Sequence, residues 1–68
     1  MVEVIIIARD INGKRTEHLL RWDEAFDYVE KTISDEDEIL LVFVADVCVY
    51  SQLGHNPITK MELLGFFA

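Results

Sequence analysis

Two segments of this chain are apolar at almost every position, and they limit the possible folds more than any other feature does. Residues 2–8 read VEVIIIA, and residues 39–45 read ILLVFVA. β-Branched and aromatic side chains of this kind favour strands. A strand with one face in water alternates apolar and polar residues, and neither segment does so. The sequence therefore predicts a small sheet that is apolar on both faces.

The first of these segments leads into a hairpin turn. Asn12-Gly13 is the dipeptide best suited to the positive φ angles of a type I′ turn. A two-residue turn here predicts a second strand from about Lys14 to Leu20. It also predicts which residues face each other across the two strands: Ile11 and Lys14, Asp10 and Arg15, Ile7 and His18, and Ile5 and Leu20.

An amphipathic helix is predicted to follow, because apolar side chains recur with helical spacing from Trp22 to Ile33. Phe26 and Val29 fall on the same arc, and acidic side chains fall on the opposite arc. Asp23 is the expected N-cap of this helix. The acidic run that begins after Ser34 marks its end.

Two interpretations of residues 47–53 remain open. In the favoured one, the strand that starts at Ile39 continues through Val47 to Tyr50, with a bulge or bend at Asp46. In the other, Asp46 is the N-cap of a short helix that ends at Gly54.

A short C-terminal helix is predicted because Thr59 and Glu62 have the spacing of a capping box, with Gly65 as a candidate C′ residue. The 68 residues then form one compact domain, 1–68, of the α+β class. The expected element order is β-β-α-β-α. The sheet is antiparallel and three-stranded with strand order 2-1-3, and the amphipathic helix covers one of its faces.

The second face of this sheet also needs a cover. Each Val, Ile or Phe side chain left in water forgoes roughly 1.5–3 kcal/mol. We expect the C-terminal segment to fold over this face. The alternative is a homodimer or a contact with another protein. The candidate oligomer-interface residues are Met61, Leu64, Phe66 and Phe67.

The charge of the chain is concentrated in one segment. Residues 22–38 carry eight acidic residues and one basic residue, so this segment alone accounts for the formal net charge of -7. Such a field opposes direct binding to nucleic acid or anionic lipid and favours a protein partner with a basic surface. An ordinary solvated face is the simpler explanation. The candidate partner-binding residues are Asp23, Glu24, Asp27, Glu30, Asp35, Glu36, Asp37 and Glu38.

No catalytic, cofactor or metal site is predicted, and we do not expect an enzyme. The glycines are isolated, so no phosphate-binding loop is indicated, and the acidic run lacks the spacing of a calcium loop. The two histidines and one cysteine are too few for a zinc site. Cys48 and His55 could form a nucleophilic pair, but a buried structural thiol is the favoured interpretation of Cys48.

The sequence also predicts a location and a role. With one cysteine, no basic signal region and no apolar run of about 18 residues, the chain is expected in the cytoplasm, without a membrane segment. The expected role is that of an inhibitor or regulator encoded by a phage or mobile element. Its acidic helix and turn would imitate phosphates on a basic, nucleic-acid-binding surface. The alternative role is that of a homo-oligomeric assembly protein.

Overall fold

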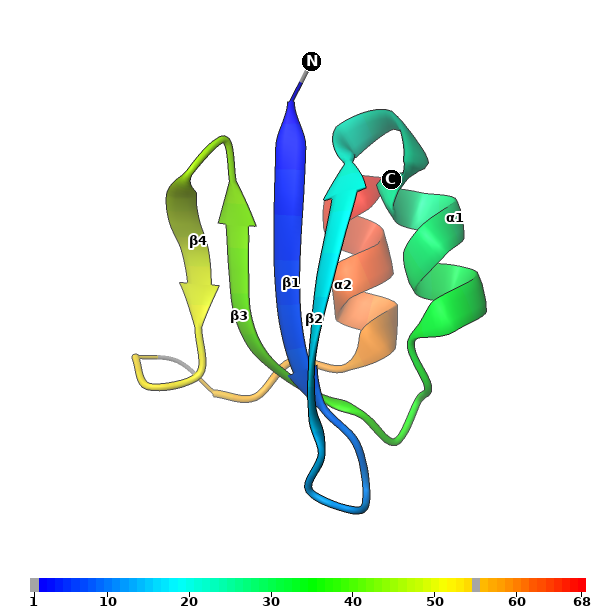
Figure 1. Cartoon of the computed structure of the whole chain (residues 1–68), viewed down its shortest axis with the longest axis vertical. Coiled ribbons are helices and arrows are strands. Elements are labelled where there is room, and N and C mark those ends of the chain that lie inside the picture. Colours follow the sequence, from blue (N-terminus) through cyan, green and yellow to red (C-terminus); the bar gives the residue numbers. More distant parts are fainter. Residues whose placement is uncertain (1, 55) are drawn as a thin grey trace.

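The computed structural model describes residues 2–54 and 56–68, which form a four-stranded antiparallel sheet and two helices (Figure 1). The strand order is β2-β1-β3-β4. The predicted α+β class and the order of the first three strands are confirmed, but the sheet has a fourth strand. The elements are β1 (Glu3–Arg9), β2 (Arg15–Arg21), α1 (Trp22–Thr32), β3 (Glu38–Val44), β4 (Val47–Ser51) and α2 (Lys60–Phe67).

The fourth strand arises from a turn that the sequence did not reveal. The chain reverses at Ala45-Asp46, where φ is 50° and 66°, and Val44 pairs with Val47. Positive φ at both central residues is characteristic of a type I′ turn. The predicted strand from Val47 to Tyr50 is present as β4, but it follows a reversal of the chain and does not continue β3. The alternative prediction of a short helix is wrong. Ala at the first turn position gives no signal for such a turn, since Asn or Gly is the usual residue there.

Ala45→Asn is expected to raise the free energy of unfolding by about 0.5–1 kcal/mol, because Asn adopts positive φ more readily than Ala. Gly13→Ala provides the opposite case, because Gly13 has φ 82° and no atom near the added Cβ. It should lower the free energy of unfolding by about 1 kcal/mol. Urea denaturation of both variants measures these changes in the free energy of unfolding. A destabilised Ala45→Asn variant would contradict the turn geometry.

The first hairpin has a three-residue loop instead of the predicted two-residue turn. The Asp10 carboxylate accepts the N–H groups of Asn12 and Lys14, both at 2.9 Å, and Gly13 N–H donates to Asp10 O at 3.0 Å. These bonds define a turn followed by a left-handed glycine. The register is therefore shifted by one residue from the predicted one. The observed pairs are Ile5 with Leu19, Ile6 with His18, Ile7 with Glu17 and Arg9 with Arg15.

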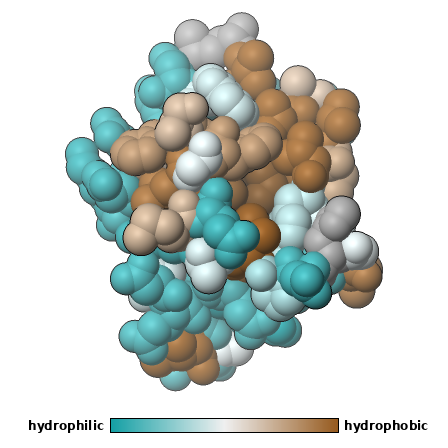
Figure 2. All heavy atoms as spheres, turned by 180° about the vertical axis from the view of Figure 1, so that it is seen from behind, coloured by the Kyte–Doolittle hydropathy of each residue, from teal (hydrophilic) through white to brown (hydrophobic). Residues whose placement is uncertain are grey.

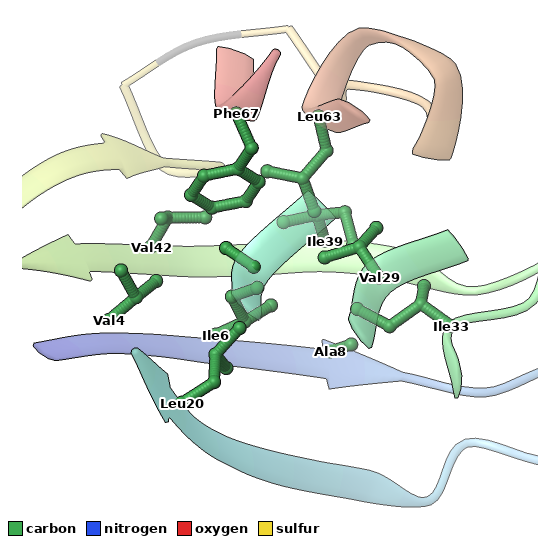
Figure 3. Packing of buried hydrophobic residues seen from close by; sticks show 11 residues of the cluster. Val4, Ile6, Ala8, Leu20, Val29, Ile33, Ile39, Val42, Leu63 and Phe67 are labelled. Atoms are coloured by element: carbon green, nitrogen blue, oxygen red, sulfur yellow. The ribbon is translucent and has the colours of Figure 1, made fainter. Parts of the chain in front are cut away.

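Both helices pack on one face of the sheet, which we call the helix face. Figure 3 shows Leu63 and Phe67 of α2 pointing at Val42 and Ile39 of β3. The one-residue shift places Leu20 on the helix face and Leu19 on the other face. The buried core consists of Val4, Ile6, Ala8, Leu20, Ala25, Val29, Ile33, Ile39, Val42, Leu63 and Phe67.

The helix boundaries partly follow the sequence signals. The predicted capping box is present, because Glu62 N–H donates to the Thr59 hydroxyl at 3.2 Å and Thr59 N–H donates to the Glu62 carboxylate at 3.3 Å. Gly65 lies inside α2 and is therefore not a C′ residue. The N-cap of α1 is Arg21 instead of Asp23, because α1 follows β2 without a loop.

The C-terminal helix does not cover the second face of the sheet, contrary to expectation. It packs beside α1 on the helix face, where Lys60 Nζ donates to Glu30 O at 2.7 Å. The extra hairpin explains this arrangement, because a sheet widened by β4 leaves space beside α1 that a second helix can fill. In Figure 1 the strands pass in front of α2, and no other described segment lies over that front face.

Candidate functional site

Three surfaces of the described structure could bind another molecule, and the first is acidic. The acidic surface consists of Asp23, Glu24, Asp27 and Glu30 on α1, followed by Asp35, Glu36, Asp37 and Glu38. All eight side chains are exposed except Asp37, which is half-buried. The four acids of α1 project away from the sheet, because Ala25 and Val29 occupy its buried side. Figure 2 shows hydrophilic residues along the flank on which α1 lies.

Two acids of this surface contact a basic side chain. Glu24 lies 3.9 Å from Arg21, and Glu38 lies 3.1 Å from Arg9. The Gln52 amide also donates to Glu38 at 3.1 Å. These bonds, first that from Gln52 and then that from Arg9, lower the pKa of Glu38 below its ordinary value. Within residues 2–54 and 56–68, the other six acids lie more than 4.0 Å from any basic side chain.

Asp37 has a local structural role. Its carboxylate accepts Ser34 N–H at 3.2 Å, and its own N–H donates to Ser34 O at 3.1 Å. The Ser34 hydroxyl accepts Glu36 N–H at 3.3 Å. These bonds form the turn between α1 and β3. The acids best placed to meet a partner are therefore those of α1, together with Asp35 and Glu36.

The second surface is the face of the sheet opposite the helices, which we call the open face. The register places Ile5 between Leu19 and Phe43, and Ile7 between Glu17 and Leu41. Cys48 of β4 lies beside Phe43. A shallow hollow on this face is lined by Ile5, Ile7, Glu17, Phe43 and Asp46. The prediction of a sheet with two apolar faces thus leads to an apolar surface that no described segment covers.

The third surface is a hollow of about 250 Å³ between β4 and α2. Its wall is mostly apolar and consists of Val42, Val49, Tyr50, Ile58, Glu62, Leu63 and Phe66. The sequence did not indicate this hollow, because the reversal that places Val47–Ser51 beside β3 was not predicted. Of the four C-terminal candidate residues, Met61 and Phe66 are exposed, Leu64 is half-buried, and Phe67 is a core residue.

The candidate nucleophile and metal ligands do not converge in the described residues. Cys48 is exposed, contrary to the prediction of a buried thiol, and its Sγ donates to Tyr50 O at 3.3 Å. His55 lies outside the described residues. His18 is half-buried on the helix face, with Nδ1 2.7 Å from the Tyr28 hydroxyl and Nε2 3.1 Å from the Thr16 hydroxyl. The described residues include no group of three or more His, Cys, Asp or Glu side chains that could hold a metal ion.

Comparison of the chain with protein-family models, curated proteins and solved structures gives no match. Among the described residues, no helix has the length and apolar character needed to cross a membrane. Functional inference therefore starts from the three surfaces themselves.

Proposed function

We propose that this protein is a small binding module that docks its acidic surface on a basic surface of another protein. The observation that carries the proposal is the exposed row of carboxylates on α1, which has few basic neighbours. Asp23 and Asp27 are four residues apart on the same side of the helix, and Glu30 continues the row. Like charges at this spacing destabilise a helix by a few tenths of a kcal/mol per pair. A basic partner would offset this repulsion.

The distribution of the charge favours recognition over solubility alone. Solubility requires a moderate net charge with both signs interspersed. Here residues 22–38 hold the whole net charge of -7. A one-signed field of this kind accelerates encounter with a surface of opposite sign. A row of carboxylates can replace phosphates on a nucleic-acid-binding protein. We therefore propose an inhibitor or regulator of such a protein, encoded by a phage or mobile element.

The proposal includes binding without catalysis and a reducing, cytoplasmic setting. Cys48 is the one cysteine of the chain, so an intramolecular disulfide is impossible. Its thiol is exposed. An oxidising compartment would favour intermolecular oxidation of such a thiol.

The test is a triple reversal, Asp23→Lys with Asp27→Lys and Glu30→Lys. Proteins captured from a host lysate by the wild-type chain are identified, purified and titrated against both chains. We expect the triple variant to bind at least about 100-fold more weakly, because three attractive contacts become repulsive. We also expect the wild-type affinity to fall at least about tenfold between low and high salt, because ions screen exposed charges.

The matched control is the triple variant Glu3→Lys with Glu17→Lys and Asp46→Lys. It changes the net charge by the same amount, but its substitutions lie on or beside the open face. The control should retain the wild-type affinity within about threefold. Equal losses in the two variants would show that only the bulk charge matters, and a triple variant that binds normally would refute the acidic surface as the docking site.

A further inference from the structure

We infer that the open face is the interface of a homodimer. The two sheets pack face to face across a two-fold axis that runs parallel to the strands, between β1 and β3. The inference does not depend on the carboxylate row of the proposed function, because Asp23, Asp27 and Glu30 are on α1, on the other side of the sheet. Glu38 belongs to both surfaces. It rests on three properties of the open face: its uncovered apolar centre, the arrangement of charges around that centre, and its size.

The apolar centre consists of Ile5, Ile7, Leu41 and Phe43, all half-buried, with Leu19 65% exposed beside them. The register makes them direct neighbours across three adjacent strands. Contiguous apolar surfaces of this kind mark interaction sites in monomeric proteins. Both helices pack on the helix face, so the described part of the chain has no further helix that could cover the apolar centre.

The proposed axis makes the apolar centre complementary to itself. A rotation about a line between β1 and β3 places β1 of one copy over β3 of the other. Residues that are paired side by side across the strands stay at the same height along the strands. Ile5 then meets Phe43 of the second copy, and Ile7 meets Leu41 of the second copy. A two-fold interface must be self-complementary in this way. Packed sheets lie about 10 Å apart with aligned strands, which allows the side chains to interdigitate.

The same rotation brings opposite charges together. By its register with Glu3, Arg21 stands at the β2 edge of the open face, where its guanidinium lies 3.9 Å from Glu24. Asp46 lies at the turn beside β4 and lines the hollow of the open face. Because the rotation exchanges these two edges, Arg21 faces Asp46 of the second copy. The rotation also exchanges β1 and β3, so the ion pair between Arg9 and Glu38 of one copy faces the same ion pair of the other, with opposite charges opposed. A two-fold axis across the strands would pair Glu3 with Arg9, but it would bring Arg15 against Arg21 and Glu38 towards Asp46. Charge complementarity therefore favours the axis parallel to the strands.

The charge balance of the open face favours a second copy over a basic partner. Three arginines and four acids surround the apolar centre, so this face is nearly neutral, and most of the net charge of -7 lies elsewhere. A strongly basic protein would be drawn to the acidic surface. A second acidic chain is repelled there and can approach closely only at the open face. The charged residues around the centre are Glu3, Arg9, Arg15, Glu17, Arg21, Glu38 and Asp46.

The size of the face indicates a weak dimer. Four strands about 4.8 Å apart and rows about 3.4 Å apart give a footprint of roughly 400 Å² per copy. Stable interfaces bury about 800 Å² per partner, so this one has about half of that area and belongs with weak, transient contacts. We expect a dissociation constant of tens of micromolar. The dimer would carry its two acidic surfaces on opposite outer sides.

Analytical ultracentrifugation of the wild-type chain between about 5 µM and about 1 mM tests the dimer. We expect the mass to rise from 7.9 kDa towards twice that value. Arg21→Glu and Asp46→Arg should each remain monomeric, because each homodimer would place like charges together. An equimolar mixture of the two variants should dimerise again, since both contacts then pair opposite charges.

Circular dichroism first verifies that each variant is folded, because Asp46 has φ 66° and Arg is strained there. Leu19→Lys alters no turn residue and should also be monomeric. Met61→Lys is the matched control, because Met61 is exposed on α2, and it should dimerise like the wild type. A wild-type chain that stays monomeric at about 1 mM would overturn the inference. So would single variants that dimerise normally, or a mixture that does not recover.

Discussion

Phe67→Ala is expected to lower the free energy of unfolding by about 3–5 kcal/mol, whereas Phe66→Ala should lower it by only about 0.5–1.5 kcal/mol. The two residues are neighbours in α2 and both contact the Trp22 ring, with centroids 5.3 Å and 5.7 Å away. Phe67 is buried against the sheet, and its removal leaves a cavity. Phe66 is 47% exposed, so its removal mainly loses ring contacts.

The difference is large for a domain of this size. At about 0.05–0.15 kcal/mol per residue, a 68-residue domain has roughly 3–10 kcal/mol of stability, so Phe67→Ala should leave a measurable unfolded fraction without denaturant. Urea denaturation followed by the fluorescence of Trp22, the one tryptophan, measures both variants. Equal losses would contradict the placement of Phe67 in the core and Phe66 on the surface.

The features that sequence reasoning predicted correctly depend on local signals. The helix follows from apolar residues at helical spacing between Trp22 and Ile33, and it ends at Thr32. The capping box of α2 follows from Thr59 and Glu62, because its two bonds join residues three positions apart. The strands β1 and β3 follow from their β-branched residues. In each case the interactions that determine the element lie within a few residues of it.

The features that sequence reasoning missed depend on competition between similar conformations. Asn12-Gly13 suits a two-residue turn, yet the Asp10 carboxylate holds two N–H groups of a longer loop. The register therefore differs by one residue from the predicted one, and each side chain of β2 lies on the face opposite to the predicted face. At Ala45-Asp46 both residues have positive φ, although Ala is not a usual residue for such a turn, and the Ala45 N–H donates to Glu3 O at 2.9 Å. The cover of the second face could not be predicted either, because it depends on the position of α2.

The candidate surfaces likewise include features that the sequence predicts and features that it does not. Exposure of the α1 acids could be predicted, because it follows from the helical period. The separation of the acidic surface from the open face could not be predicted, because it requires both helices to lie on one side. This arrangement allows the two proposed contacts to coexist. A second copy would occupy the open face while a basic partner meets α1, and a dimer could then bind two partners.

The register of the first hairpin provides the last prediction, a comparison of Leu20→Lys with Leu19→Lys. Leu20 is 6% exposed in the core, and Leu19 is exposed on the open face. A lysine at position 20 loses the burial of leucine, at about 2–5 kcal/mol, and brings a charge into the core at a further cost of several kcal/mol. This sum reaches the whole expected stability, so Leu20→Lys should be unfolded.

Leu19→Lys should remain folded, with a change in the free energy of unfolding within about 0.5 kcal/mol for the monomer, because its side chain stays in water. Circular dichroism of the two variants at low micromolar concentration makes the comparison without interference from dimers. In the register expected from a two-residue turn, each β2 side chain would point to the opposite face, and the two outcomes would be exchanged. A folded Leu20→Lys chain beside an unfolded Leu19→Lys chain would therefore refute the three-residue loop. It would also refute the homodimer, because Leu19 would no longer lie on the open face.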